Sequence, residues 1–82
     1  MSFYVYIIYS QSHDKYYIGQ TSNFEDRMTR HNNGLEKFTA PFCPWVRICV
    51  VEKSNRSEAM ILEKKLKNLN RIKLLAFIEK YR

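Results

Sequence analysis

The chain is predicted to be a single α+β domain, a three-stranded antiparallel sheet packed with about three helices. Residues 3–9 are apolar at every position and rich in aromatic and β-branched side chains, which is typical of a strand covered on both faces. Strand-like and helix-like segments follow one another in the order β-β-α-β-α-α, and residues 1–82 leave room for one domain only. If the buried first strand is central, the strands lie in the order 2-1-3.

The segment after this first strand is expected to return beside it as a hairpin. Residues 10–14 are polar and predict a turn, and residues 15–20 predict the second strand. Gly19 lies near the end of that strand, where the absence of a side chain lets a ligand or another chain segment approach closely.

A helix is predicted next. Ser22 and Glu25 have the spacing of a capping box, and Asn33-Gly34 is a typical helix end. Its buried side is predicted to carry Phe24, Met28 and Leu35.

The middle of the chain is predicted to form a loop and the third strand. Residues 36–45 contain Pro41 and Pro44 and favour a loop. Residues 46–52 favour a strand, with Val46, Ile48 and Val50 on one side.

Two helices are expected at the end, capped by Asn55 and Asn70. The apolar stripe of the first is predicted to be Ala59, Leu62, Leu66 and Leu69, and that of the second Ile72, Leu75 and Ile78.

Composition excludes several classes of protein. Residues 1–4 carry no basic side chain, so we expect no signal peptide, and the longest apolar run is far shorter than the roughly 20 residues of a membrane helix. Cys43 and Cys49 lack C-x-x-C spacing, and we expect two reduced thiols in a cytoplasmic protein. A zinc site could be composed of His13, His31, Cys43 and Cys49, but their spacing matches no zinc-binding pattern.

The net charge of +6 is unevenly distributed along the chain. Residues 1–52 hold five basic and five acidic side chains, whereas residues 53–82 hold nine basic and three acidic ones. Such a basic segment either binds a polyphosphate such as DNA or is a solvated helix face that only aids solubility. Charge alone does not choose between the two.

Five polar side chains occupy positions where packing does not require them. Tyr6 and Tyr17 lie in the first two strands, Arg27 and His31 are four residues apart on one helix face, and Glu63 borders an apolar stripe. Each has an ordinary structural explanation when it is taken alone: a core tyrosine, a surface arginine, a histidine at a helix end, a glutamate paired with a nearby lysine.

Taken together, these residues resemble the motifs of the GIY-YIG nucleases. Val5-Tyr6-Ile7 and, nine residues later, Tyr17-Ile18-Gly19 are similar to the two triplets that name the family. The family's helix motif is similar to Asn23-Phe24-x-x-Arg27-x-x-x-His31-Asn32-x-Gly34. Two later segments resemble the later blocks of the short single-domain branch: Thr39 to Trp45, and Glu58-Ala59-x-x-x-Glu63-x-x-x-Lys67. That branch is similar to the catalytic module of the excision-repair incision subunit and of structure-specific resolvases.

The chain departs from the family pattern at two positions. Val5 replaces the first glycine, and Gln20 stands where the repair-subunit module has a lysine. An equivalent of the extra asparagine of some phage relatives cannot be placed. The catalytic set that the resemblance implies is therefore Tyr6, Tyr17, Arg27, His31 and Glu63.

The resemblance also implies roles for these residues. Glu63 would bind one divalent ion, Mg²⁺ or Mn²⁺, and Arg27 would hold the scissile phosphate. Tyr17 would orient water or phosphate. Two alternatives remain for the general base: Tyr6, with its pKa lowered by Arg27 and the metal, or His31, with Tyr6 only positioning water.

We therefore expect a metal-dependent DNA endonuclease that leaves 3′-hydroxyl and 5′-phosphate ends, with a role in DNA repair or recombination. Because the chain has no separate base-reading domain, the target would be set by DNA structure, by single-strandedness or by a recognition partner protein. The expected DNA track is Arg30, Lys37, Lys64, Lys67 and Arg71. The alternatives are a non-catalytic nucleic-acid-binding module of the same fold, and an adaptor whose basic end binds an acidic partner. The sequence leaves the oligomeric state open.

Overall fold

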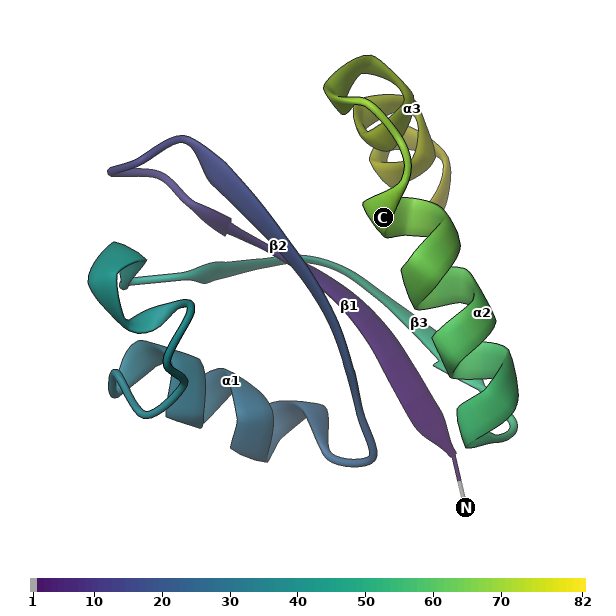
Figure 1. Ribbon diagram of the computed structural model, residues 1–82, viewed down its shortest axis with the longest axis horizontal. Coiled ribbons are helices and arrows are strands. Elements are labelled where there is room, and N and C mark those ends of the chain that lie inside the picture. Colours follow the sequence, from purple (N-terminus) through teal and green to yellow (C-terminus); the bar gives the residue numbers. More distant parts are fainter. Residues whose placement is uncertain (1) are drawn as a thin grey trace.

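The computed structural model describes residues 2–82 and confirms the α+β class (Figure 1). The sheet is antiparallel with the strand order β2-β1-β3, so the buried first strand is central, as predicted. In chain order the elements are β1 (Phe3–Ser10), β2 (Lys15–Thr21), α1 (Phe24–Asn32), the 3-10 turn η1 (Ala40–Phe42), β3 (Val46–Lys53), α2 (Arg56–Lys67) and α3 (Arg71–Tyr81).

Both faces of the sheet are covered, which explains why β1 is apolar throughout. Successive side chains of a strand point to opposite faces. Val5 and Ile7 pack under α2 and α3, whereas Tyr6 and Ile8 pack on the other face with Phe24 of α1. Figure 1 shows α1 on one side of the strands and α2 with α3 on the other.

A β-bulge in β3 makes one sequence prediction wrong. Ile7 of β1 faces Cys49 and Ile8 faces Arg47, so Ile48 is an extra residue between them. The bulge breaks the alternation: Ile48 joins the cluster under α2 and α3, and Val50 joins the cluster under α1. Val46 lies in neither cluster and is 47% exposed.

Two of the predicted helix caps are confirmed and one is displaced. The side chains of Asn55 and Asn70 accept hydrogen bonds from backbone N–H groups in the first turns of α2 and α3. At α1 the cap is Asn23, one residue after the predicted Ser22, and it accepts from the N–H of Asp26.

Two buried faces also differ from the prediction. Leu35 lies beyond the end of α1 and is 58% exposed. In α3 the residues facing the sheet are Leu74, Phe77 and Ile78, while Ile72 and Leu75 are exposed. The stripes 72-75-78 and 74-77-78 both have helical spacing, so the sequence period alone could not choose between them.

The two cysteines are free and lie in different apolar clusters, Cys43 beside α1 and Cys49 beneath α3. Their separation by the sheet agrees with the expected reduced thiols. Within residues 2–82, every helix is too short or too polar to cross a membrane.

The long connection after α1 is held in place by a clamp on Asn32. Its amide donates to the carbonyl of Trp45 and accepts from the N–H of Trp45, and the Trp45 indole N–H donates to the carbonyl of Thr39 at 3.0 Å. Trp45 is buried, so the clamp anchors the 33–45 segment over the sheet.

We expect Asn32→Ala to lower the free energy of unfolding by about 1–2 kcal/mol, because two part-buried backbone groups lose their partner. Urea denaturation measures this change. Asn33→Ala removes a neighbouring side chain that makes no such clamp and is the matched control. Equal losses in the two variants would contradict the clamp.

Candidate active site

The ring of Tyr6 lies directly over Gly19 of the neighbouring strand. The two residues face each other in the β1–β2 ladder. A Cβ atom on Gly19 would lie 2.5 Å from the Tyr6 hydroxyl oxygen, closer than any real contact. The missing side chain therefore lets the tyrosine extend across β2, which gives the glycine of the Tyr17-Ile18-Gly19 triplet a physical reason.

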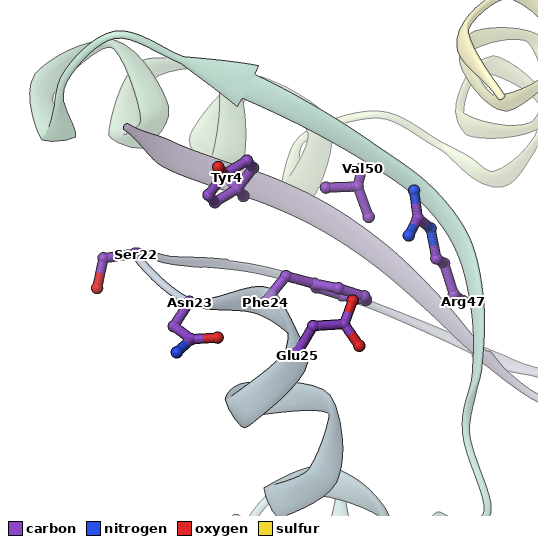
Figure 2. Close-up of a pocket in the computed structure, with 7 residues that line it drawn as sticks. All are labelled: Tyr4, Ser22, Asn23, Phe24, Glu25, Arg47 and Val50. Carbon is purple, nitrogen blue, oxygen red and sulfur yellow. The ribbon is translucent and has the colours of Figure 1, made fainter. Parts of the chain in front are cut away.

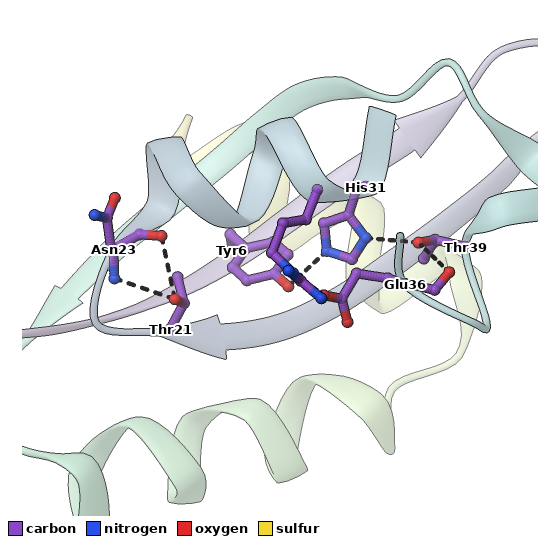
Figure 3. A network of polar contacts seen from close by, with 7 residues as sticks. Tyr6, Thr21, Asn23, His31, Glu36 and Thr39 are labelled. Carbon is purple, nitrogen blue, oxygen red and sulfur yellow. Dashed lines mark hydrogen bonds and ion pairs between the residues drawn. The ribbon is translucent and has the colours of Figure 1, made fainter. Parts of the chain in front are cut away.

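Tyr6 begins a buried chain of hydrogen bonds (Figure 3). Its hydroxyl is 2.8 Å from Nε2 of His31, and Nδ1 of His31 is 2.6 Å from the hydroxyl of Thr39. The Thr39 hydroxyl donates to the carbonyl of Glu36 at 3.4 Å. Tyr6, His31 and Thr39 are each at most 1% exposed.

The direction of this chain depends on the tautomer of His31, and one tautomer satisfies every contact. When the Thr39 proton goes to the Glu36 carbonyl, the Thr39 oxygen accepts from His31 Nδ1–H. His31 Nε2 is then unprotonated and accepts from the Tyr6 hydroxyl. The imidazole is thus oriented to remove a proton from Tyr6.

The pKa of the Tyr6 hydroxyl is raised above its ordinary value. Burial raises this pKa and nearby Tyr17 raises it further, while Arg27 opposes them with a smaller effect. Arg27 therefore lowers this pKa as expected, but burial outweighs its effect. Burial likewise lowers the pKa of His31; Glu36 raises it, and Arg27 and Arg30 lower it. Both groups are neutral at pH 7.

Tyr17 and Arg27 complete the group on this face of the sheet. The Tyr17 ring centroid is 5.3 Å from that of His31 and 6.4 Å from that of Tyr6. Arg27 is half-buried and lines a cleft of about 250 Å³ together with Gln20 and Arg56. Four of the five predicted catalytic residues are therefore close together, contributed by β1, β2 and α1.

Glu63 approaches the same strand from the other face of the sheet. Its Oε1 atom accepts from the Gln20 side-chain amide at 3.1 Å, and its Oε2 atom is 3.2 Å from the Lys67 ammonium. Gln20 follows Gly19 in β2 and lines the cleft that contains Arg27. The five predicted residues are thus distributed around residues 17–20 of β2, with Glu63 on the α2 side.

The oxygen atoms on the α2 side fit a hard divalent cation. Glu63 supplies one carboxylate, and the side-chain oxygen of Gln20, whose amide nitrogen contacts Glu63, is buried with no hydrogen-bond partner among residues 2–82. A site with so few protein oxygens suits Mg²⁺ or Mn²⁺, which keep several waters. In the described part of the chain, no three His, Cys, Asp or Glu side chains gather as a metal site, which disfavours the zinc alternative.

The cations predicted to contact DNA have varied surroundings. Arg30 pairs with Glu36, Lys67 with Glu63 and Arg71 with Asp14. Lys37 is exposed, as is Lys64, which lines a hollow of about 350 Å³ with Glu63 and Lys67. These ion pairs are exposed enough for a phosphate to compete with them.

A further cavity, of about 330 Å³, lies away from this group, between the start of α1 and strands β1 and β3 (Figure 2). Tyr4, Asn23 and Arg47 are among the residues that line it, and none of the predicted catalytic residues does. It is separate from the Tyr6–His31 chain.

The sequence interpretation missed three residues of the site. Arg56 precedes Glu63 by seven residues, two helical turns, and this spacing on one helix face could have indicated it. The amide of Gln20 was noted only as a departure from the family. Thr39 lies in a loop, and no local pattern links it to His31.

The chain matches the family model of the GIY-YIG catalytic domain over residues 2–75. The chain belongs to the GIY-YIG family. GIY-YIG domains are nuclease domains that generally use divalent metal ions, so membership points to endonuclease activity on DNA.

A solved structure of similar fold matches nearly the whole chain. The chain is similar to the solution NMR structure of the UPF0213 protein BH0048 from Bacillus halodurans, with 28% sequence identity and a TM-score of 0.64. The match covers 96% of this chain and 84% of that one. No curated protein matches the chain.

We expect Gly19→Ala to lower stability by about 1–3 kcal/mol, because the new methyl group must displace the buried Tyr6 ring. In a Tyr6→Ala background the same change should cost little, since the obstacle is gone. Denaturant unfolding of the wild type, the two single variants and the double variant measures this double-mutant cycle. An equal cost in both backgrounds would show that Gly19 serves some other purpose.

Proposed function

We propose that this protein is a metal-dependent endonuclease that hydrolyses DNA phosphodiester bonds. The observation that carries the proposal is the directed Tyr6–His31–Thr39 hydrogen-bond chain, which lies beside Arg27 and across the strand edge from Glu63. A core tyrosine needs only one hydrogen-bond partner. A neutral imidazole oriented by a second hydroxyl is the arrangement of a proton acceptor.

In the proposed reaction, Tyr6 and His31 together remove the proton from the attacking water. As the water oxygen bonds to phosphorus, its proton passes to the Tyr6 oxygen and the Tyr6 proton passes to Nε2 of His31. Tyr6 does not have to be ionised before the reaction begins. This fits its environment, because burial raises the pKa of Tyr6 and so disfavours the ionised form. This combines the two alternatives for the general base.

The phosphate would be held in the cleft between Arg27 and Arg56. The guanidinium of Arg27 can donate two parallel hydrogen bonds and offset the charge added in the transition state. Glu63 would hold the divalent cation, which supplies Lewis-acid stabilisation of the phosphate. The bond from phosphorus to the 3′ oxygen breaks, and that oxygen takes a proton from solvent to give 3′-hydroxyl and 5′-phosphate ends.

An aromatic cavity next to Tyr17 supports selectivity for unpaired nucleotides. The cavity is about 220 Å³ and is lined by Tyr17, Phe38, Phe42 and Trp45, with Lys15 beside them. Phe38 is 81% exposed, an unusual position for so large an apolar side chain. Such rings stack on unpaired bases with little regard for sequence. Junctions or single strands that arise in repair or recombination are therefore the proposed targets, alone or with a recognition partner.

We expect Mg²⁺- or Mn²⁺-dependent cleavage of single-stranded, flapped or four-way DNA in preference to plain duplex. Glu63→Gln should lose at least about 100-fold in rate, the scale of one lost charge-stabilising contact. Gel assays on a substrate panel measure this, with Glu79→Gln, an exposed change on α3, as the control. Full activity of a folded Glu63→Gln protein would refute the metal assignment. DNA binding without cleavage by the wild type would favour the binding-module alternative.

The pH profile tests the proton path. Because neutral His31 accepts the proton, kcat/KM should rise with pH through the lowered pKa of His31, below 6.5, and stay level from about pH 7 to pH 9. A tyrosinate base would instead give a rate that climbs about tenfold per pH unit toward pH 10. Tyr6→Phe should be inactive yet folded, since its ring keeps the packing over Gly19.

A further inference from the structure

Phe38 is a large apolar side chain that the fold leaves open to solvent. It is 81% exposed, although it lines the aromatic cavity beside Tyr17. The other rings of this cavity, those of Tyr16, Tyr17, Phe42 and Trp45, each pair with a further aromatic ring. In the part of the chain that the structure describes, Phe38 pairs with none. Its ring is therefore free for a ligand to stack on.

The exposure of Phe38 does not come from a loosely held loop. The backbone N–H groups of Thr39 and Ala40 donate to the carbonyl of Glu36 at 3.2 and 2.9 Å. The carbonyl of Thr39 accepts from the indole of buried Trp45. Because these bonds fix the backbone next to Phe38, a ligand that stacks on the ring does not have to order the loop first.

The size and charge of the cavity favour one base of a DNA strand. Its volume of about 220 Å³ is below the roughly 300 Å³ of the smallest sites for drug-sized ligands, which suits a single base rather than a base pair. The exposed Lys15 ammonium lies 4.9 Å from the centroid of the Phe42 ring and makes no ion pair among residues 2–82. A cation beside apolar rings complements a nucleotide, because the base stacks on the rings and the phosphate is negative.

The cavity adjoins the proposed catalytic group through two of its own walls. Tyr17 lines the cavity, and its ring centroid is 5.3 Å from that of His31. Thr39 lines it too, and its hydroxyl is 2.6 Å from Nδ1 of His31. A base held against Tyr17 therefore places its own sugar and phosphate beside the Tyr6–His31 pair. The stacked base and the bond that is cut then belong to one nucleotide or to immediate neighbours.

We propose that Phe38 determines the specificity of the enzyme: its ring stacks on the unpaired base next to the scissile phosphate, and this contact fixes where the strand is cut. Lys15 holds a phosphate of the same nucleotide. The inference rests on the endonuclease function proposed above and deepens it by naming the residue that selects an unpaired base and the position of that base. A paired base has to leave its duplex before it can stack there, which disfavours plain duplex.

Binding to fluorescein-labelled DNA in EDTA, followed by fluorescence anisotropy, tests the contact without cleavage. Phe38→Ala should weaken binding to a single strand about 5- to 150-fold, the effect of losing one stacked base. Phe38→Trp should restore it, and all variants should bind plain duplex alike. Leu35→Ala is the matched control, because it removes another exposed apolar side chain of the same loop that lies outside the cavity. Wild-type affinity of Phe38→Ala for the single strand would overturn the proposal.

Abasic sites locate the stacked base. On flapped DNA, whose junction fixes the register, removing the base next to the cut should weaken wild-type binding by the same factor as Phe38→Ala. The two changes together should cost no more than either alone, because they remove the same contact. Losses that multiply would show that Phe38 and this base do not touch.

The role of Lys15 has its own test. Lys15→Gln should reduce the slope of log affinity against log salt by about 0.7 on a single strand, the effect of one lost phosphate contact. Lys80→Gln removes an exposed charge from α3, on the other side of the sheet, and is the control. An unchanged slope in Lys15→Gln would remove Lys15 from the site.

The outcomes separate this proposal from the function itself. If Glu63→Gln abolishes cleavage while Phe38→Ala binds and cuts flapped DNA like the wild type, the role of Phe38 is refuted and the endonuclease proposal stands. If the wild type cuts no DNA but Phe38→Ala and the abasic site show their shared loss, the base contact stands and the endonuclease function fails. If Phe38→Ala instead dissociates a wild-type dimer in sedimentation and leaves DNA binding unchanged, the ring covers a second copy of the chain and the proposal is wrong.

Discussion

The contact between the Tyr6 ring and the bare backbone of Gly19 is the constraint on which the site depends. Because Gly19 has no side chain, the ring of Tyr6 in the central strand can extend over β2 and reach His31 of α1. His31 in turn fixes Thr39, and Thr39 accepts the Trp45 indole through its carbonyl. One missing side chain thus connects the sheet, α1 and the long loop into a single arrangement of polar groups.

The sequence was sufficient where local patterns carry the information. The all-apolar β1 predicted a central strand, and Asn55 and Asn70 predicted helix starts, because these features depend on neighbouring residues alone. The prediction failed at Ile48 and Leu75. A bulge is set by how two strands pair, and the buried stripe of α3 is set by the surface that it meets, so neither is written in a short window.

The same distinction applies to the site. Tyr6, Arg27, His31 and Glu63 could be proposed from motif spacing, and the fold brings all four around one stretch of β2. The pairing of His31 with Thr39, the joining of Arg56 to the Arg27 cleft and the burial that raises the pKa of Tyr6 arise from contacts distant in sequence. Spacing selected the candidate residues, and only packing shows which of them are buried and which hydrogen-bond partners they have.

β2 is an outer strand of the sheet, with Tyr17 and Gly19 serving the α1 face and Gln20 serving the α2 face. Outer strands attract other strands, since their backbone groups on one side are unpaired. Any chain that paired along β2 would cover the strip on which the two halves of the site meet. Under the proposed function, self-association along this edge and loss of catalysis would therefore be one event.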